Sequence, residues 1–282
     1  MRIALATSLT MIAFAANSIL TRMAIEGGHI DPSGFAIVRV ASGALVLGMI
    51  ISVRGGGLPL LRRNRIPGAI SLAVYLVGFS LAYLTLDAGL GALILFGVVQ
   101  ITMFGHGALR GTAPTTRQIA GGAVAFLGLL IALWPGPGGA ADPAGAVLMI
   151  FAGLGWAAYS IIGRSAADPL ASTAANFLLC VPILLVLLTG TGLTFSAVGI
   201  ALGILCGGLT SGLGYALWYS VLPKIAGATA AVVQLSVPVI AIVAGAVLLG
   251  ETIGLAVVLA TIMVVGGIGW SVTARSVQAD RN

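Results

Sequence analysis

Long apolar runs without a charged side chain dominate the sequence. Uncharged windows of roughly membrane-spanning length occupy residues 3–21, 66–86, 88–109, 118–141, 143–163, 225–250 and 252–274. A longer window, 169–223, holds two spans separated by the turn-like Thr189–Gly192, and 34–53 adds one span that only Arg39 interrupts. Because about 20 residues cross the hydrocarbon as a helix, the pattern predicts ten spans. The runs are continuous rather than alternating, which favours helices over a barrel.

The composition fits this pattern. Hydrophobic residues make up 59% of the chain and charged residues 7%, whereas roughly a quarter of the residues in a soluble domain are charged. We therefore expect an all-α integral membrane protein with ten transmembrane helices. No metal site or cofactor is expected, and an enzyme is a remote alternative, since Glu26, His29 and Asp31 fit no metal or nucleophile pattern.

The charged residues separate onto two sides of the predicted bundle. With the N-terminus inside, 11 of the 13 basic residues lie on the inner side: Arg2, Arg54, Arg62, Arg63, Arg65, Arg110, Arg117, Arg164, Lys224, Arg275 and Arg281. The outer side receives mainly acidic residues and one histidine: Glu26, His29, Asp31, Asp87, Asp142 and Glu251. Loops rich in Arg and Lys stay in the cytoplasm, so both termini are expected there, in the inner (plasma) membrane. Contact with anionic lipid explains the basic pI without a nucleic-acid partner.

One phrase occurs twice in the chain. FAANSILTR at Phe14–Arg22 and WAAYSIIGR at Trp156–Arg164 share five of nine residues. GFSLAYLTL at Gly78 similarly resembles GYALWYSVL at Gly214. The sequence thus divides into two five-helix repeats, 1–135 and 143–275, followed by a cytoplasmic tail, 276–282. Since five is odd, the second repeat is inverted relative to the first, an arrangement typical of secondary transporters that bind substrate near the bilayer midplane.

A segment of the second repeat carries a family resemblance. PVIAIVAGAVLLGET at Pro238–Thr252, together with the two five-helix copies, resembles the EamA-type carriers of the drug/metabolite transporter superfamily. The first copy departs from this motif, with Gly111-Thr112 in place of Gly-Glu and no proline matching Pro238. Members of the family export amino acids and other metabolites. The size and aromatic content are most similar to the aromatic and neutral amino acid exporters.

Ten side chains are candidate substrate contacts: Asn17, Tyr75, Phe79, Tyr83, Gln100, Trp156, Tyr159, Tyr215, Gln234 and Ser236. Tyr75, Phe79 and Tyr83 are four residues apart and share a helix face, and the repeat maps Phe79 onto Tyr215. Trp156 lies too deep for an interfacial belt, so it is a candidate to stack on or gate the substrate. Simple packing, interfacial anchoring of the tyrosines and structural bonding by the amides are the alternatives.

Two prolines and one arginine complete the set of candidates. Pro182 and Pro238 free backbone carbonyls within predicted spans and are candidate hinges. Arg39 lies about one turn below the outer surface, and we expect it to pair with Glu26 or Asp31 in a structural role. No Asp or Glu lies in the middle third of any span. This absence favours uncoupled facilitated diffusion of a substrate with little net charge.

The sequence therefore predicts a secondary transporter that exports small neutral metabolites across the plasma membrane by alternating access. Amino acids, of aromatic, Met or Thr type, are the favoured substrate class, and the aromatic side chains would line the cavity. A carrier of the same fold for drugs, purines or sugar derivatives is the alternative. The oligomeric state is open, and a monomer is compatible with the sequence.

Overall fold

The structure, a computed structural model, is all-helical in the residues that it describes. These residues are 2–60, 62, 65–110, 115–134, 141–164, 166–188, 192–225 and 233–279. The predicted turn at Thr189–Gly192 and the Gly111-Thr112 pair fall largely or wholly outside them.

The helices follow the apolar windows of the sequence. They are α1 (Arg2–Glu26), α2 (Pro32–Val53), α3 (Arg65–Ala82), α4 (Ala88–Leu109), α5 (Thr116–Leu133), α6 (Pro143–Arg164), α7 (Pro169–Leu187), α8 (Ala197–Ile204), η1 (Leu205–Leu213), α9 (Gly214–Val221), η2 (Leu222–Lys224), α11 (Ser236–Leu248) and α12 (Leu255–Ala279). Of these segments, eight are long and apolar enough to cross a membrane, with α8, η1 and α9 together forming one of them. Two shorter apolar helices, Ser236–Leu248 and Leu255–Trp270, add to them. The prediction of an all-α chain of apolar helices is confirmed.

Polar side chains mark where several helices begin. The Asp31 carboxylate accepts a hydrogen bond from the Gly34 N–H, and Pro32 occupies the first turn of α2. Asp168 caps α7 in the same way, and Thr115 caps α5. A carboxylate or hydroxyl at this position satisfies N–H groups that have no partner within the helix. The second oxygen of Asp31 accepts from the Thr194 N–H at 2.7 Å, which ties the start of α2 to the segment before α8.

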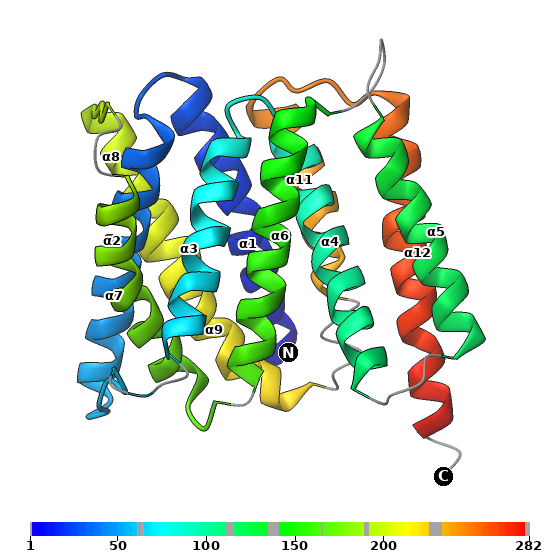
Figure 1. Ribbon diagram of the computed structural model, residues 1–282, viewed down its shortest axis with the longest axis horizontal. Coiled ribbons are helices and arrows are strands. Elements are labelled where there is room, and N and C mark those ends of the chain that lie inside the picture. Colours follow the sequence, from blue (N-terminus) through cyan, green and yellow to red (C-terminus); the bar gives the residue numbers. More distant parts are fainter. Residues whose placement is uncertain are drawn as a thin grey trace.

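The helices pack in pairs (Figure 1). The most extensive contacts join α5 with α12, α3 with α6, and α2 with α7. The continuous segment α8–η1–α9 packs against α1 and α2, and α11 packs against α4. The α5–α12 pair stands at one side of the bundle, and among the described residues its main contacts with the rest are limited ones with α4.

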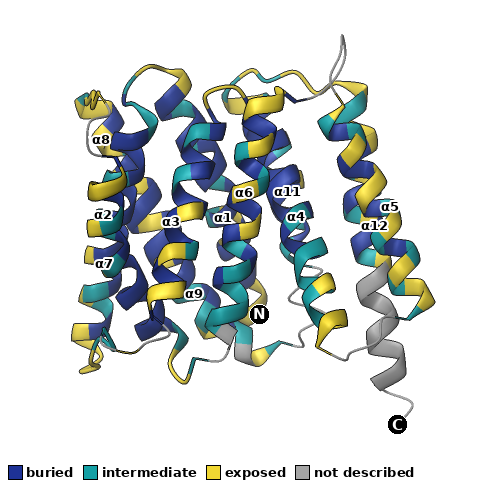
Figure 2. Cartoon of the chain, in the orientation of Figure 1, coloured by how far each residue is buried: buried dark blue, intermediate teal, exposed yellow. Residues whose placement is uncertain are grey.

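Buried and exposed residues separate as expected for a bundle in lipid (Figure 2). The interior holds apolar and aromatic side chains from many helices, while large apolar side chains such as Leu45, Val186 and Val247 are exposed on the outside. An apolar exterior is stable only where the surrounding solvent is also apolar. This surface therefore agrees with the membrane-spanning helices.

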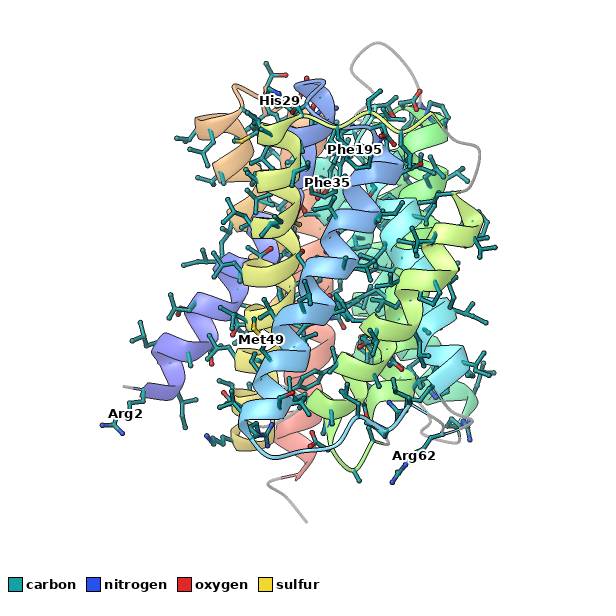
Figure 3. All side chains as sticks on the ribbon, turned by 90° about the vertical axis from the view of Figure 1, so that its left-hand side faces the viewer. Arg2, His29, Phe35, Met49, Arg62 and Phe195 are labelled. Carbon is teal, nitrogen blue, oxygen red and sulfur yellow. The ribbon has the colours of Figure 1, made fainter. Side chains whose placement is uncertain are left out.

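The two ends of the bundle differ in charge (Figure 3). His29 and Phe195 lie at one end, which we call the acidic end because Glu26, Asp31 and Asp87 belong to it, and Arg2 and Arg62 lie at the opposite, basic end. His29 on the one hand and Arg2 and Arg62 on the other, which the sequence assigns to opposite sides, thus lie at opposite ends of the bundle.

The middle of the eighth span is a π-helix, η1. Glycines at Gly199, Gly203 and Gly207 bring this span against α2 and the turn before it, where an added methyl would meet His29, Val38 and Arg39 respectively. The small-residue ridge expected from the sequence therefore serves close backbone contact. π-Helices are rare in proteins and often occur at functional sites.

Candidate functional site

A small, partly open cavity lies among α1, α3, α4, α6 and α9. Its volume is about 20 Å³, enough for one water molecule. The lining residues are Phe14, Asn17, Ser18, Tyr75, Phe79, Leu95, Phe96, Trp156 and Tyr215. Five of the ten candidate contacts from the sequence (Asn17, Tyr75, Phe79, Trp156 and Tyr215) are therefore brought together around one space.

Aromatic rings form most of the cavity wall. Trp156 contacts Tyr75 and Tyr215, with ring centroids 5.0 and 5.2 Å apart, and Tyr75 contacts Phe79 at 5.3 Å. Phe14 meets Tyr215 edge to face at 5.7 Å. Such ring contacts are favourable at these separations. Trp156 thus joins the ring stripe on α3 to that on α9.

Asn17 connects the cavity to the π-helix. Its side-chain oxygen Oδ1 accepts hydrogen bonds from Thr210 Oγ1 at 2.7 Å, Ser211 Oγ at 3.1 Å and Cys206 Sγ at 3.3 Å. All four residues are buried. Buried polar groups are costly unless they are bonded, so this network fixes η1 against α1. Thr210, Ser211 and Cys206 were not among the sequence candidates, because no sequence pattern indicates a π-helix here.

Arg39 differs from its predicted role. The sequence predicted an ion pair with Glu26 or Asp31, and the structure contradicts this. Glu26 instead lies 2.8 Å from Arg22, while Arg39 is fully buried. Arg39 Nε donates to Ser211 Oγ at 3.2 Å and Nη2 donates to the Tyr75 hydroxyl at 2.8 Å. Arg39 begins too deep to reach the acidic end, about 10 Å along α2 at 1.5 Å per residue.

The guanidinium of Arg39 lies against the cavity wall. Its carbon Cζ is 4.9 Å from the centre of the Phe79 ring and 5.3 Å from that of the Tyr75 ring. Both rings line the cavity, whereas Arg39 itself does not. A positive charge thus lies directly beside the aromatic cavity, held by ring faces and hydroxyl groups.

The other five candidate contacts are outside the cavity lining, although Tyr83 contacts the Phe79 ring and Tyr159 stacks on Trp156. The Tyr83 hydroxyl donates to the Ala88 carbonyl, towards the acidic end. The Tyr159 hydroxyl donates to Thr173, which in turn donates to Tyr219. Gln100 is buried in α4, the Ser236 hydroxyl donates to the Val233 carbonyl, and Gln234 lies two residues before Ser236. None of the five lines the cavity.

The two candidate hinges also lie in helices. Pro182 lies within α7, and Pro238 is buried in the first turn of α11. A proline in a helix interior removes one backbone hydrogen bond, whereas one in the first turn removes none. The bend expected from Pro238 therefore has a weaker physical basis than that expected from Pro182.

Comparison with known proteins identifies the family. The EamA-like transporter family matches residues 143–273. The uncharacterized protein PA1977 of Pseudomonas aeruginosa is 43% identical over 289 residues, which cover 99% of this chain and 98% of that protein. The chain belongs to the EamA-like transporter family. A crystal structure of a protein 16% identical in sequence superposes with a TM-score of 0.67 over 95% of this chain and 98% of the other, which shows a shared fold.

The Gly-Glu pair of this EamA-like protein lies at the acidic end. Gly250, with a φ of 70°, ends α11 in the left-handed conformation that glycine adopts without strain. The chain then turns so that the Glu251 carboxylate accepts from the N–H groups of Ala88 at 2.6 Å and Gly89 at 3.4 Å. Glu251 thereby caps α4 from another part of the chain, a placement that the positive end of the α4 dipole favours.

Arg22 extends this contact into a larger network at the acidic end. Its Nη1 donates to the Tyr83 carbonyl at 3.0 Å, its Nη2 lies 3.5 Å from Asp87, and its Nε lies 2.8 Å from Glu26. Asp87 precedes α4 but makes no side-chain cap to it. Arg22, Asp87 and Glu251 together, which we call the acidic-end clamp, join α1, the start of α4 and the α11–α12 turn in this EamA-like bundle.

Two carboxylates at the acidic end have pKa values shifted in opposite directions. Burial raises the pKa of Glu251, and the Ala88 N–H offsets this only in part. By contrast, the Gly145 N–H, followed by the Thr85 hydroxyl, lowers the pKa of Asp142. Compared with an ordinary carboxyl group, Glu251 of this family member therefore takes up a proton at higher pH, and Asp142 takes one up at lower pH.

Proposed function

We propose that this protein is a secondary transporter that exports small neutral metabolites across the inner membrane. The substrates that we favour are amino acids of aromatic, Met or Thr type. The family supports transport of a small molecule. The observation that carries the substrate class is the cavity of contacting aromatic rings between α1, α3, α6 and α9. Aromatic walls bind an apolar side chain, and the hydroxyl and amide groups beside them bind the polar backbone of an amino acid.

The pairing of helices supports an inverted repeat. An exchange of residues 1–135 with 143–275 replaces α1 by α6 and replaces α3 by the α8–η1–α9 segment. The contact between α3 and α6 then becomes the contact between α1 and that segment, and both contacts are present. The pairs α2–α7, α4–α11 and α5–α12 each exchange their own members. This is the contact pattern that a two-fold axis in the membrane plane requires.

Alternating access follows from this symmetry. The 20 Å³ cavity is too small for an amino acid, so the conformation is closed around the site. At the acidic end, the clamp of Arg22, Asp87 and Glu251 joins the two repeats. We propose that release of this clamp opens the cavity to one side, and that separation at the basic end opens it to the other. With the basic end in the cytoplasm, as the positive-inside rule indicates, the acidic end is the exit.

Transport into liposomes tests the proposal. Purified protein is reconstituted, and uptake of labelled Phe, Met and Thr is measured with and without an imposed pH gradient. Uncoupled facilitated diffusion predicts uptake that does not depend on the gradient. Competition by unlabelled drugs, purines and sugar derivatives measures the alternative substrates. Strong competition by one of these classes, with no uptake of amino acids, would replace the amino-acid assignment.

The Trp156→Ala variant tests the role of the cavity. Loss of the ring that contacts both Tyr75 and Tyr215 is expected to lower uptake at least about tenfold, the rate change given by 1.36 kcal/mol. Trp134→Ala is the matched control, since Trp134 is 71% exposed at the end of α5. Size-exclusion profiles establish that both variants fold. Uptake at the wild-type rate by Trp156→Ala would exclude Trp156 from the transport path.

A further inference from the structure

Arg39 is a buried charge without a counter-ion. No carboxylate of the described residues lies within ion-pair distance of its guanidinium, and the ion pairs among them join Arg22 to Glu26 and Asp87. Nη1 of Arg39 is buried and has no hydrogen-bond partner, while Nε and Nη2 bond Ser211 and Tyr75. An arginine inside the membrane costs several kcal/mol and is usually paired or functional. The described structure supplies no partner of opposite charge.

The partly satisfied guanidinium matches the geometry of a carboxylate. Ser211 fixes the orientation of the side chain through Nε, which leaves the Nη1–Nη2 edge as the free end of the fork. A carboxylate binds this edge through two parallel N–H···O bonds. At present one of these donors is unpaired and the other bonds a neutral hydroxyl, that of Tyr75. A phenol hydroxyl is a weaker partner for a cation than an ionised oxygen.

We infer that Arg39 is the binding site for a carboxylate group of the substrate. This inference rests on the proposed transport function and adds to it a required chemical group. The body of the substrate occupies the aromatic cavity lined by Trp156, Phe79 and Tyr215, and the carboxylate faces the Nη1–Nη2 edge of Arg39. A substrate with an acidic group and an apolar or aromatic body satisfies both features. Amino acids and their deaminated analogues have this form, whereas the corresponding amides and amines do not.

The closed conformation explains why the Tyr75 hydroxyl lies on Nη2. Because the cavity admits only one water molecule, its wall must move before substrate enters. Tyr75 lines this wall and also accepts a hydrogen bond from Arg39. Displacement of Tyr75 therefore enlarges the cavity and uncovers the guanidinium in a single movement. In the closed state, the hydroxyl occupies the position that a substrate oxygen takes in the open state.

Binding of benzoate to the wild-type protein tests the inference without mutation. Thermal unfolding in detergent is followed over increasing concentrations of sodium benzoate, benzamide, benzylamine and sodium chloride. Benzoate is expected to bind on the order of ten- to hundredfold more tightly than benzamide, the factor that a charge-assisted hydrogen bond supplies. Equal stabilisation by benzoate and benzamide would show that the site selects the ring only. An equal effect of chloride would show a site for inorganic anions. Either result overturns the inference.

Three variants assign the selectivity to Arg39. In Arg39→Gln, the preference for benzoate over benzamide is expected to disappear. In Arg117→Gln, the control, it is expected to persist, since Arg117 lies over Trp270 in the α5–α12 pair. Tyr75→Phe keeps the ring but removes the competing hydroxyl, so benzoate should stabilise it at least as much as wild type. Loss of the benzoate effect in Tyr75→Phe, or its persistence in Arg39→Gln, contradicts the inference. If Arg39→Gln does not fold, the wild-type and Tyr75→Phe results decide.

The same panel separates this inference from the proposed function. Benzoate selectivity that depends on Arg39, without uptake of any amino acid, would retain the carboxylate site and reject the amino-acid substrate. Uptake of amino acids together with equal uptake of their amides would retain the carrier and reject the carboxylate site. If neither benzoate nor amino acids bind, both are rejected.

Discussion

At the scale of single residues, the polar groups near the cavity are arranged around two side chains. Asn17 accepts three hydrogen bonds through one oxygen, and Arg39 donates two through its guanidinium, with Ser211 bonded to both. Buried groups of this kind contribute little when bonded but cost much when left unpaired. The middle of the bundle therefore depends on a few specific atoms as well as on apolar packing.

The Asn17→Ala variant tests this dependence. Removal of the amide oxygen leaves Thr210, Ser211 and Cys206 without their shared acceptor, so the free energy of unfolding is expected to fall by about 1–3 kcal/mol. Denaturant unfolding in detergent measures the change. Asn176→Ala is the comparison, since Asn176 is equally buried and its side-chain oxygen has no partner, while a side-chain hydrogen bond joins it to Tyr159. A larger loss for Asn176→Ala than for Asn17→Ala would contradict the importance of the network.

Several cavity-lining residues were predictable from helical spacing, from the internal repeat or from their depth in a span. Spacing by four placed Tyr75 and Phe79 on one face, and both line the cavity. Tyr83 shares that face but lies one turn further along, where its hydroxyl meets Ala88. Arg39 was assigned to the wrong partner because sequence gives depth along a helix but not the direction of a long side chain. Glu26 was already within reach of Arg22, four residues earlier on its own helix.

At the scale of elements, the contact between α2 and η1 has little room for larger side chains. A methyl group added at Gly207 would overlap the Arg39 carbonyl and the Ser42 hydroxyl, whereas one at Gly208 would meet only Val46 at 3.2 Å. Backbone atoms cannot move aside as a flexible side chain can. This glycine therefore determines the separation of η1 from α2, and with it the position of Arg39.

The Gly207→Ala variant is expected to destabilise the protein by about 1–3 kcal/mol or more, because overpacking forces the two backbones apart. Gly208→Ala in the same π-helix is expected to cost less. Thermal unfolding of both variants measures the difference, and benzoate binding by Gly207→Ala reports whether Arg39 has moved. Equal stability of the two variants would show that the α2–η1 contact can relax without cost.

At the scale of the whole molecule, residues far apart in sequence meet at the acidic end. Glu251 caps α4, and Arg22 joins α1 to Asp87 and to the Tyr83 carbonyl. The apolar windows predicted the helices, and the distribution of basic residues predicted the two ends. Neither predicted the clamp, because no local pattern shows that a glutamate after α11 will cap α4. The repeat, read from short shared phrases, remains a prediction that the helix pairing supports.

The clamp should make stability depend on pH through Glu251. Because the pKa of Glu251 is raised above its ordinary value of 4.5, the folded state favours the protonated form. The contribution of protonated Glu251 to the stability of the folded state is fully present below pH 4.5 and is lost as pH rises through the raised pKa. Relative to Glu251→Gln, the wild type should therefore lose stability between pH 4.5 and 7.

Unfolding midpoints of the two proteins over this range measure the effect. Asp142→Asn is the control. The pKa of Asp142 is lowered below 3.8, so its contribution changes only at lower pH and its difference from wild type should stay constant here. A difference between wild type and Glu251→Gln that also stays constant would show that Glu251 does not titrate in this range.

The π-helix has one more consequence, for the tolerance of the chain to changes in length. Its wider turns accommodate more residues than an α-helix of the same rise. Deletion of one residue within Leu205–Leu213 would therefore convert the segment towards an α-helix, while the helices on either side keep their orientation. Tyr215 would then stay in the aromatic wall, but the hydrogen bonds of Thr210 and Ser211 to Asn17 would be lost. A homologous chain with a single-residue gap in this segment should accordingly keep the aromatic wall and lack the Asn17 network.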